Sequence, residues 1–573
     1  MTALGIDTAI SIGRVRPVTQ RHEAVLVARL RVLLVALLFA LVALAALSRI
    51  VFLGIGGGAS GPASLEEALL PDRGEIVDRN GTPMARNFPA RALWFNPKAM
   101  GDGGTPLTRS AEEVATRIAA IFPEADKAII LRRLTSGKAG YLRRRVLPEQ
   151  ANQIHALGEL ALELPEETDR HYPQGSLGAH VLGYVTHDGD GKVGMEQVLQ
   201  SRLTDPALRG EPMALSIDMR VQGALEDELR SGMLATNAMG AAGIVLDVDT
   251  GEVMALASLP EFDPNVMDRR VVDYEFNRVT NQVYELGSTF KPLSVAAAID
   301  AGVVRDFSKR WNARDVEISN AVLADSHFLG NHLNVPEALI QSSNTVTARI
   351  ADELGAERLR RTMIDLGMNE RPYIELPARG HPIWPKGKWP RLRNMTISYG
   401  HGIAVTPLHL ASAYAAMVNG GVWRPATLQK LEAGEVPRGR RVFKESTSSR
   451  MRQLLRMIAI YGTGKNADAK GYRVGGKTGS AEKPGKRGYR ETSLVSTFAA
   501  AFPMDNPRYV VVAMLDEPKG THASSFQRTA AWNAAPIVGK LVPRIGPLMG
   551  VRPDMSRDVD ISDLKPLIPG GGT

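Results

Sequence analysis

The sequence of 573 residues contains no cysteine, so no disulfide can contribute to its stability. A reducing cytosol and an oxidising exported compartment both allow such a composition, so this absence decides little about location. Metal-binding patterns are lacking too, because there is no His-Glu-x-x-His motif and the histidines occur singly. We therefore expect no metal and no cofactor.

The excess of basic residues lacks the pattern that is typical of nucleic-acid-binding proteins. The chain has a formal net charge of +8 and an isoelectric point near 9.5. Its lysines and arginines are scattered, however, and it has neither a zinc-finger spacing nor an RNP-like aromatic motif. We expect no nucleic-acid partner. Outside a bacterial membrane, a basic surface would instead face acidic lipid or cell-wall polymer.

Long hydrophobic runs are lacking everywhere except near the N-terminus. Residues 32–48 read VLLVALLFALVALAALS, without charge between Arg31 and Arg49, and no second run of comparable length follows. Together with the RIVFLG segment, the run covers roughly 20 residues, which is enough for a helix to span a bilayer. The sequence therefore predicts one transmembrane anchor over residues 32–53.

The charges before this run predict its orientation. Basic residues outnumber acidic ones there: Arg14, Arg16, Arg21, Arg29 and Arg31, against Asp7 and Glu23. The positive-inside rule places residues 1–31 in the cytoplasm and the bulk of the chain outside it. A cleaved signal peptide is the alternative, but the apolar run and the segment before it are both long for one.

A chain of this length is expected to form more than one core. Residues 54–64 (GIGGGASGPAS) have the composition of a flexible linker. Residues 65–210 mix short strand and helix patterns, and we expect an elongated, mixed α/β, non-catalytic module there. Residues 211–545 are expected to form a larger domain. Residues 546–573 are rich in proline and glycine, and we expect a loose tail.

The larger domain has the patterns of an α+β fold. Residues 241–260 consist of two apolar runs around Asp249-Thr250-Gly251, which is typical of a β-hairpin. Other patterns follow: strands at 496–503 and 508–515, a closing helix at 529–542, and helices at about 293–366 and 407–418. This order predicts an antiparallel sheet flanked by helices, with a helical subdomain inserted.

The stretch YELGSTFKP, residues 284–292, places a serine three residues before a lysine. At positions i and i+3 of a helix, Ser288 and Lys291 share a face, so the lysine amine can reach the serine hydroxyl. Gly287 allows a tight turn into the helix, whose first N–H groups favour negative charge. Pro292 disfavours helical geometry at Lys291 but is tolerable in a first turn. Alternatively, Ser288 is only an N-cap beside a solvated lysine.

Alone, this Ser-x-x-Lys motif is weak, because the chain repeats it at residues 480–483 and 562–565. Two further motifs strengthen it. They are Ser342-Ser343-Asn344 and Lys477-Thr478-Gly479, the second followed by strand patterns. Either could be a turn or a strand end by itself. The order S-x-x-K, S-x-N, K-T-G is the signature of penicillin-binding proteins and class A β-lactamases.

The chain resembles the class B penicillin-binding proteins, and within them the division-specific type. Besides the three motifs and the single anchor, six stretches carry the resemblance: RGEIVDRNG (73–81), RHYP (170–173), HVLGY (180–184), GKVGMEQ (191–197), SLPEFDPN (258–265) and SYGHGIAVTPL (398–408). The first four are similar to stretches of the family's non-catalytic module, and the last two to stretches of its catalytic domain. The resemblance covers most of the chain.

The resemblance implies a serine-type D,D-transpeptidase that acts on D-alanyl-D-alanine stem peptides of peptidoglycan. It implies that Ser288 is the nucleophile and that Lys291 is its general base, which must be largely neutral. Ser342 would relay a proton to the leaving nitrogen, and Asn344 would hold the substrate amide and Lys291. Lys477 would supply the nearby cation that helps to keep Lys291 neutral.

The resemblance further implies how the substrate is bound. Lys477 and Thr478 would bind its terminal carboxylate, and Gly479 would let its backbone lie close to the strand. The N–H groups of Ser288 and Ser480 would form the oxyanion hole. β-Lactams would mimic the donor and acylate Ser288 as covalent inhibitors.

The chain departs from the family pattern at a few positions. Leu286 stands where proline is frequent, and Ser480 stands where threonine often follows K-T-G. Residues 519–536 lack the usual tyrosine- and glycine-rich form, which leaves the acceptor side open. His401 could lie near the site, but a packing or loop role is favoured.

Several alternatives stay open at this point. An elongation-type class B transpeptidase has similar motifs, although residues 258–265 and 398–402 favour the division type. A non-enzymatic β-lactam sensor should carry several membrane spans, and a scaffold without catalysis should have lost a motif. An anchor and a large module are superfluous for a hydrolytic β-lactamase. A Ser-His-Asp hydrolase is disfavoured, because Ser288 lacks the G-x-S-x-G elbow.

Partners and location follow from the resemblance alone. The protein would be a single-pass protein of the bacterial inner membrane, mostly periplasmic and enriched at the division site. Its partners would be a polytopic SEDS-type glycosyltransferase and other membrane proteins of the division machinery.

Overall fold

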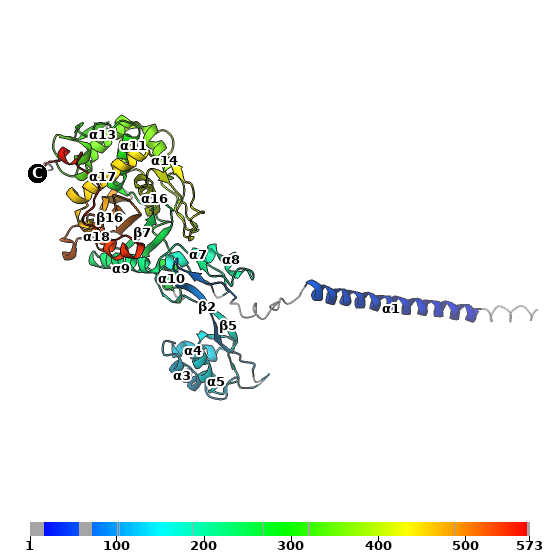
Figure 1. The fold of residues 1–573 in the computed structure, drawn as a ribbon. Helices are drawn as coiled ribbons and strands as arrows, with labels where there is room; N and C mark the ends of the chain where they lie inside the picture. Colours follow the sequence, from blue (N-terminus) through cyan, green and yellow to red (C-terminus); the bar gives the residue numbers. More distant parts are fainter. Residues whose placement is uncertain are drawn as a thin grey trace, which may run out of the picture. The chain divides into compact units, whose positions relative to one another are not determined.

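The structure, a computed structural model, describes residues 16–56, 72–99, 101, 104–186, 188–266, 269–318, 321–485 and 488–569 of the chain. Internal packing divides the chain into two units, Met1–Leu70 and Pro71–Thr573. Figure 1 shows the described part of the first unit as one long helix and the second unit as packed helices and strands.

The helix of the first unit is α1 (Arg16–Gly56), which has 41 residues. Its segment Arg29–Arg49 has a mean hydropathy of 2.8 and is long and apolar enough to cross a membrane. The predicted anchor over residues 32–53 lies within α1. The predicted linker is wrong in its first residues, because residues 54–56 belong to α1. The helix can include the two glycines there, since each glycine in a helix costs only about 1 kcal/mol relative to alanine. Residues 1–15 and 57–64 lie outside the described residues.

The first part of the second unit is a sheet around the long strand β2 (Pro83–Phe95). β2 pairs antiparallel with β1, β3, β4 and β5, and β1 pairs in parallel with β6. The other strands are β1 (Ile76–Val77), β3 (Gly140–Val146), β4 (Leu162–Glu163), β5 (Glu166–His171) and β6 (Met213–Ala214). The helices are α3 (Ala111–Ile121), α4 (Lys127–Leu134), α5 (Pro148–His155), α6 (Ala179–Leu182), α7 (Gly194–Val198) and α8 (Gln200–Thr204). This mixed α/β content confirms the predicted fold class of the module.

A small core of its own holds α3, α4 and α5 against one end of β2. Phe95, Ile118 and Phe122 are fully buried in it. A side chain caps the N-terminus of α3, where Ser110 Oγ accepts from the N–H of Glu113 at 3.2 Å. These local contacts and the apolar face of each helix explain why this part folds as a separate layer.

The larger part of the second unit is built on an antiparallel sheet, which confirms the prediction, and this sheet has five strands. Its strand order is β15-β16-β17-β7-β8. The strands are β7 (Gly240–Asp247), β8 (Val253–Leu259), β15 (Gly475–Gly485), β16 (Gly488–Phe502) and β17 (Tyr509–Asp516). The predicted hairpin is β7–β8, and Gly251 has a φ of +81° in its turn, a value that suits glycine.

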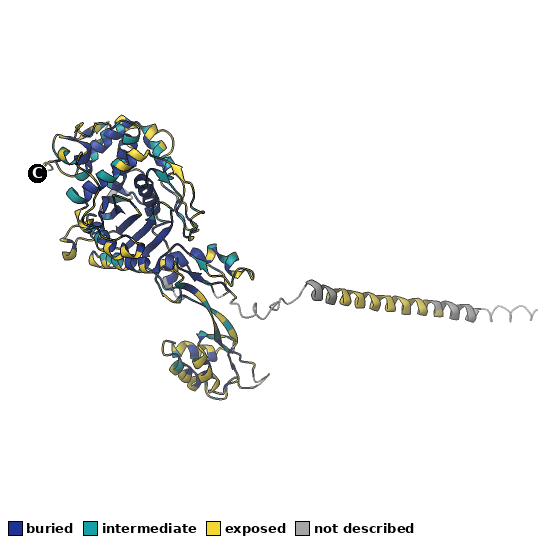
Figure 2. Cartoon of the chain, viewed as in Figure 1, coloured by how far each residue is buried: buried dark blue, intermediate teal, exposed yellow. Residues whose placement is uncertain are grey.

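Successive side chains along each strand point to opposite faces of the sheet, and this alternation produces two cores, one on each face. Along β17, Val511 and Ala513 belong to one core, while Val510 and Val512 belong to the other. α9 (Met219–Ala235) and α18 (Ala534–Ile545) cover the first face. Figure 2 shows the strands as a buried layer inside the larger part.

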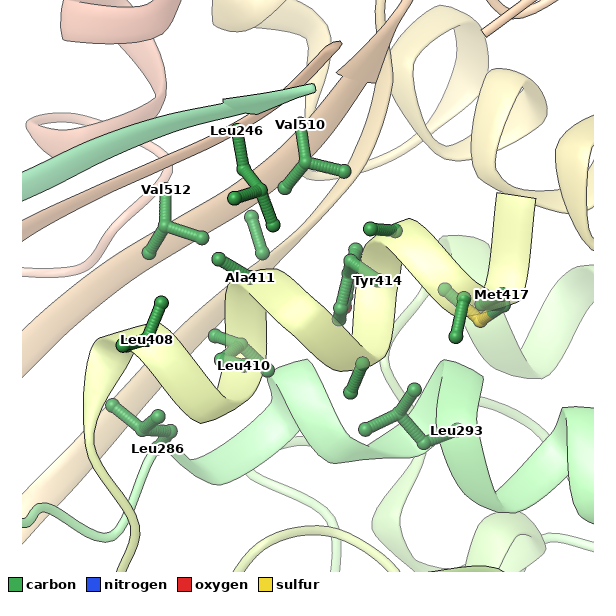
Figure 3. Close-up of a cluster of buried hydrophobic side chains, with 14 of the residues drawn as sticks. Leu246, Leu286, Leu293, Leu408, Leu410, Ala411, Tyr414, Met417, Val510 and Val512 are labelled. Carbon is green, nitrogen blue, oxygen red and sulfur yellow. The ribbon is translucent and has the colours of Figure 1, made fainter. Parts of the chain in front are cut away.

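α16 (Pro407–Val418) covers the other face, and all of its residues are buried. Figure 3 shows α16 between the sheet, with Leu246 and Val512, and α11 (Lys291–Asp300), with Leu293. The Tyr414 hydroxyl donates to the carbonyl of Thr289 at 2.8 Å, which ties this central helix to the turn before α11. The core therefore reaches directly to the candidate nucleophile.

A helical subdomain lies beyond α11. Its helices are α12 (Val335–Ile340), α13 (Asn344–Leu354), α14 (Ala356–Asp365), α15 (Arg391–Ile397) and α17 (Glu445–Tyr461). The predicted helical run over 293–366 is wrong between 311 and 333. Four short strands occur there: β9 (Trp311–Asn312), β10 (Val316–Ile318), β11 (Ala321–Leu323) and β12 (His332–Leu333). They pair as two small ladders, β10 with β11 and β9 with β12, which local periodicity cannot reveal.

The tail from residue 546 is not loose, which contradicts the prediction from its composition. Leu564 and Ile568 are buried in the main core. Arg456 of α17 forms a two-pronged ion pair with Asp558, with Nε at 2.8 Å from Oδ1 and Nη2 at 2.7 Å from Oδ2. Tertiary contacts thus order a segment whose proline and glycine content suggested disorder, up to residue 569, where the described part ends.

Candidate active site

The turn that carries Ser288 begins as a short 3-10 helix, Gly287–Phe290, and continues without a break into α11. Lys291 has α-helical φ and ψ values of −55° and −45°, and its N–H donates to the carbonyl of Ser288. Pro292 therefore sits in the first turn of α11, where its missing N–H would have no partner in any case. It leaves the Ser288–Lys291 turn undistorted.

Ser342 lies at the centre of the site, between two lysines that come from different parts of the chain. Lys477 Nζ donates to Ser342 Oγ at 2.9 Å, and Lys291 Nζ donates to the same oxygen at 3.1 Å. Lys291 Nζ also donates to the Ser342 carbonyl. Lys477 Nζ has a further contact to the carbonyl of Thr478 at 3.0 Å. The Ser-x-Asn motif therefore contacts both of the other motifs, through Lys291 and through Lys477, and Ser288 lies one helical turn before Lys291.

Both lysine side chains are fully buried, and this burial dominates their electrostatics. Burial lowers the pKa of Lys477 to about 7. Burial, and then the positive charge of Lys477, hold the pKa of Lys291 well below its usual value, while Asp325 acts in the opposite direction. A largely neutral Lys291 beside a more readily protonated Lys477 is the arrangement that a general base requires.

The Ser-x-Asn motif forms the turn between α12 and α13. Ser342 has a φ of +62°, in the left-handed region, and Ser343 caps α13 by accepting from the N–H of Val346 at 3.2 Å. The Asn344 side-chain amide donates to the carbonyl of Ala324 at 3.1 Å. The expected contact between Asn344 and Lys291 is not among the hydrogen bonds of the described residues, since the amide is oriented toward Ala324.

The Lys-Thr-Gly motif lies on β15 directly beside the nucleophile's turn. A side chain at Gly479 would place Cβ 2.4 Å from the carbonyl oxygen of Leu286 and 2.7 Å from Cγ2 of Thr289. Only glycine therefore allows β15 and the 3-10 helix to pack this closely. The structure thus gives Gly479 a packing role, and its predicted role in making room for substrate stays a prediction.

The neighbours of Gly479 are also held by hydrogen bonds. The Thr478 hydroxyl lies 2.7 Å from that of Thr463, and Ser480 Oγ accepts from the N–H of Ala530 at 3.0 Å. Residues 519–536, whose composition departs from the family pattern, are thereby fastened to the edge of the site.

His401 lies nearer to the site than sequence reasoning favoured. A side chain at Gly400 would collide with the carbonyl oxygen of Gly287 at 2.2 Å, so this segment presses against the nucleophile's turn. The N–H of Gly402 donates to Glu285 Oε1 at 3.0 Å. Burial lowers the pKa of His401, while the charge of Glu285 acts in the opposite direction.

Sequence reasoning missed Asp325, a residue of the loop after β11. Its carboxylate accepts from Ser343 Oγ at 2.8 Å and from Thr345 Oγ1 at 2.9 Å. No motif surrounds it, and only the fold brings it to the Ser-x-Asn turn. Within the described residues, no group of three or more His, Asp or Glu side chains could hold a metal ion.

A serine one turn before a buried lysine, which shares a second serine with a second lysine on a strand edge, defines a serine–lysine acyl-transfer site on an α+β fold. The family described as "Penicillin binding protein transpeptidase domain" matches residues 241–539, and that described as "Penicillin-binding Protein dimerisation domain" matches residues 68–210. The chain belongs to the penicillin-binding protein transpeptidase family.

Curated relatives match over most of their length. The chain is 36% identical over 491 residues to the probable peptidoglycan D,D-transpeptidase FtsI of Caulobacter vibrioides, covering 84% of this chain and 82% of that protein. It is 30% identical over 506 residues to the peptidoglycan D,D-transpeptidase FtsI of Escherichia coli, covering 84% of each. It is 30% identical over 528 residues to the stage V sporulation protein D of Bacillus subtilis, covering 84% of this chain and 79% of that protein.

A solved structure shares the fold. Penicillin binding protein 3 of Mycobacterium tuberculosis, complexed with aztreonam, superposes with a TM-score of 0.66 at 24% identity, covering 84% of this chain and 98% of that chain.

Proposed function

We propose that the chain is a peptidoglycan D,D-transpeptidase of cell division, which cross-links stem peptides through an acyl-enzyme on Ser288. The observation that carries this proposal is that Lys291, one helical turn after Ser288, and Lys477 are both buried and both donate to Ser342 Oγ. The FtsI names of two relatives support both the reaction and the division role.

In the acylation step, the neutral Lys291 amine takes the proton of Ser288 Oγ as this oxygen attacks the penultimate carbonyl of the donor stem peptide. The C–N bond to the terminal D-alanine breaks, and its nitrogen receives a proton through Ser342. Ser342 Oγ suits this relay, because it accepts from both lysine amines and can pass its own proton on. An ester on Ser288 and free D-alanine result.

Substrate contacts come from the strand edge and the Ser-x-Asn turn. Lys477 and Thr478 bind the terminal carboxylate, a charge-assisted contact, and Asn344 holds the substrate amide. The N–H groups of Ser288 and Ser480 stabilise the oxyanion, and one such donor typically lowers the barrier by about 3 kcal/mol. The close packing at Gly479 supports this assignment, because it brings β15 beside the nucleophile's turn.

In the second step, the amine of a neighbouring stem peptide attacks the ester. A new amide bond forms, the Ser288–carbonyl bond breaks, and the proton lost by the amine returns to Ser288 Oγ through Lys291. The same carbonyl chemistry makes β-lactams acylating inhibitors of Ser288, since their ring opens without releasing a leaving group.

The place of action follows from the anchor. α1 would hold the chain in the inner membrane as a single-pass protein, with residues 1–31 cytoplasmic and the rest periplasmic. We retain residues 65–210 as a non-catalytic module and 211–545 as the catalytic domain. The module would contact a SEDS-type glycosyltransferase and other membrane proteins of division. An elongation-type role is the second candidate, because a relative that is not named for division is as similar as the Escherichia coli one, so similarity does not separate the cellular roles.

Labelling of the full-length protein with a fluorescent penicillin tests the reaction. We expect one long-lived adduct, mapped by mass spectrometry to Ser288, which Ser288→Ala abolishes. Ser562→Ala is a matched control, because it removes the serine of another Ser-x-x-Lys motif and should label normally. An adduct that turns over within seconds would indicate a β-lactamase instead.

Localisation of a fluorescent fusion tests the division role. We expect enrichment at midcell in dividing cells. A uniform signal along the sidewall would favour the elongation-type role and would leave the proposed reaction untouched.

A further inference from the structure

The loop residue Asp325 uses both of its carboxylate oxygens on the residues that directly follow Ser342. Oδ1 accepts from the N–H of Asn344 and, at 3.2 Å, from the N–H of Thr345. Oδ2 accepts from Ser343 Oγ at 2.8 Å and from Thr345 Oγ1 at 2.9 Å. One side chain thus holds two backbone amides and two hydroxyls of the Ser-x-Asn turn.

This turn needs an external brace because its backbone is strained. Ser342 has a φ of +62°, and a non-glycine residue in the left-handed region is strained because its Cβ crowds the backbone carbonyl. Few local bonds are available, since α12 ends at Ile340 and α13 begins at Asn344. On the N-terminal side, Ser343 N–H donates to Ala338 O at 2.8 Å. On the C-terminal side, Asp325 adds four bonds to the cap that Ser343 Oγ forms with the N–H of Val346.

Asp325 also contributes a charge to a site that holds two buried lysines. Its negative charge raises the pKa of Lys291, against burial and against Lys477. Asp325 acts on Tyr399 as well. Burial, and then the charge of Asp325, raise the pKa of Tyr399 to about 12. Two other charged or titratable groups act near Lys291: Lys477 from β15, and His401. Around His401 lie Glu285, before the 3-10 helix, and Glu482 from β15.

We propose that Asp325 is a positioning residue of the transpeptidase, which braces the Ser342–Asn344 turn and supplies the negative charge that balances the two buried lysines. It touches neither substrate nor reacting atoms, and it acts through Ser342 and Lys291. This inference rests on the proposed function, because it assigns Asp325 a part in the acylation of Ser288.

The test compares Asp325→Asn and Asp325→Ala in the full-length protein. The second-order rate constant of acylation by a fluorescent penicillin is measured between about pH 5 and pH 9, since such a profile reports the titrating groups of the free enzyme. Asp306→Asn is the matched control: Asp306 also accepts from a backbone N–H and a hydroxyl, both of Ser308, at 2.8 and 2.6 Å, but in an exposed loop.

The two variants separate charge from geometry. Asparagine keeps an oxygen for the backbone N–H groups and a polar partner for the hydroxyls, but it removes the charge. The pKa of Lys291 then falls further, so the acid limb of the profile moves to lower pH. Alanine also removes the brace, and we expect a drop in rate of about 10- to 100-fold, because displacing a positioned group costs up to about 100-fold. Asp306→Asn should match the wild type.

The outcomes are distinguishable. If the wild type itself is not acylated, the proposed function fails. If the wild type is acylated and both Asp325 variants reproduce its rate and its acid limb, the inference about Asp325 is overturned. If Asp325→Ala does not fold, as judged by thermal melting, Asp325→Asn decides: a shifted acid limb supports the inference, and an unshifted one overturns it.

Discussion

Two fully buried lysines are the residues on which the chemistry of this site depends. Lysine in water is charged at neutral pH, and burial disfavours that charge. Because Lys291 experiences both burial and the charge of Lys477, it is the more readily neutral of the two. In the proposed mechanism, two side chains of the same type thus take different roles, Lys291 as the base and Lys477 as the cation.

This division of roles predicts a bell-shaped pH dependence for acylation by a depsipeptide donor that ends in a free carboxylate. The base must be neutral, so the rate is lost as pH falls through the pKa of Lys291. The carboxylate-binding cation must be protonated, so the rate is also lost as pH rises through the pKa of Lys477, about 7. The measurement is kcat/KM against pH, which reports free-enzyme groups.

The control is the same donor with an amidated C-terminus. Without a carboxylate to bind, the protonation of Lys477 no longer favours binding, and the basic limb should disappear while the acid limb stays. A basic limb that is identical for both donors would contradict the role of Lys477.

At the residue scale, the sequence predicted the members of the site better than their contacts. The three motifs predicted Ser288, Lys291, Ser342 and Lys477 from their spacing and order, and the structure brings Lys291 and Lys477 to Ser342 Oγ. Asp325 had no such signal, since it reaches the Ser-x-Asn turn only when the loop after β11 folds back. The orientation of the Asn344 amide toward Ala324 depends on the same loop, so it was equally hidden.

At the scale of elements, the site depends on how closely β15 packs against the 3-10 helix. Gly479 permits this approach, and the carbonyl of Leu286 occupies the space that a side chain would need. The rate of acylation is therefore sensitive to the position of a whole strand.

We expect Gly479→Ala to reduce the rate of penicillin acylation by about 100-fold, because a misplacement of about 1 Å can cost that much. The added Cβ meets backbone atoms, so the strand or the helix must move. Rates are measured by fluorescent-penicillin labelling, with circular dichroism to confirm the fold. Gly140→Ala is the control: it also lies on a strand, and nothing lies within 4 Å of its added Cβ. Equal rates for Gly479→Ala and the wild type would refute the packing argument.

Elements with a strong hydrophobic pattern in the sequence could be predicted. Short strands that form only because they pair with another segment could not. The hairpin β7–β8 and strand β17 are continuous apolar runs, which identify buried strands. The short ladders between 311 and 333 are only two or three residues long and depend on partners elsewhere. The tail beyond residue 546 misled the prediction because Arg456 and Asn334, distant in sequence, provide its partners.

At the scale of the whole second unit, two of the stretches that carried the family resemblance meet each other. Tyr172, from RHYP, and Asn265, from SLPEFDPN, form a reciprocal pair. The N–H of Tyr172 donates to Asn265 Oδ1 at 3.0 Å, and Asn265 Nδ2 donates to the carbonyl of Tyr172 at 2.9 Å. One amide side chain thus bonds both backbone groups of a buried residue, whose carbonyl also accepts from the N–H of Gly175 at 3.0 Å, and it joins the module to the catalytic domain.

We expect Asn265→Ala to destabilise the second unit while leaving acylation of Ser288 intact. An unsatisfied buried backbone group costs about 1–3 kcal/mol. For a unit as large as Pro71–Thr573, whose unfolding entropy is about 1 kcal/mol/K, each kcal/mol lowers the melting temperature by about 1 °C. The readouts are the melting temperature and the rate of penicillin acylation, measured on the same preparation.

The Asn265→Asp variant shows which half of the pair matters. Aspartate keeps the oxygen that accepts from the Tyr172 N–H, but it cannot donate to the Tyr172 carbonyl, and its charge faces that oxygen. It should therefore melt below the wild type even though one bond remains. If both variants melt like the wild type, the junction is held by its other contacts, such as the N–H of Gly178 that donates to Glu226 at 2.9 Å, and the pair is incidental. If acylation slows together with melting, the junction and the catalytic site are coupled, and the module then has a means of controlling Ser288.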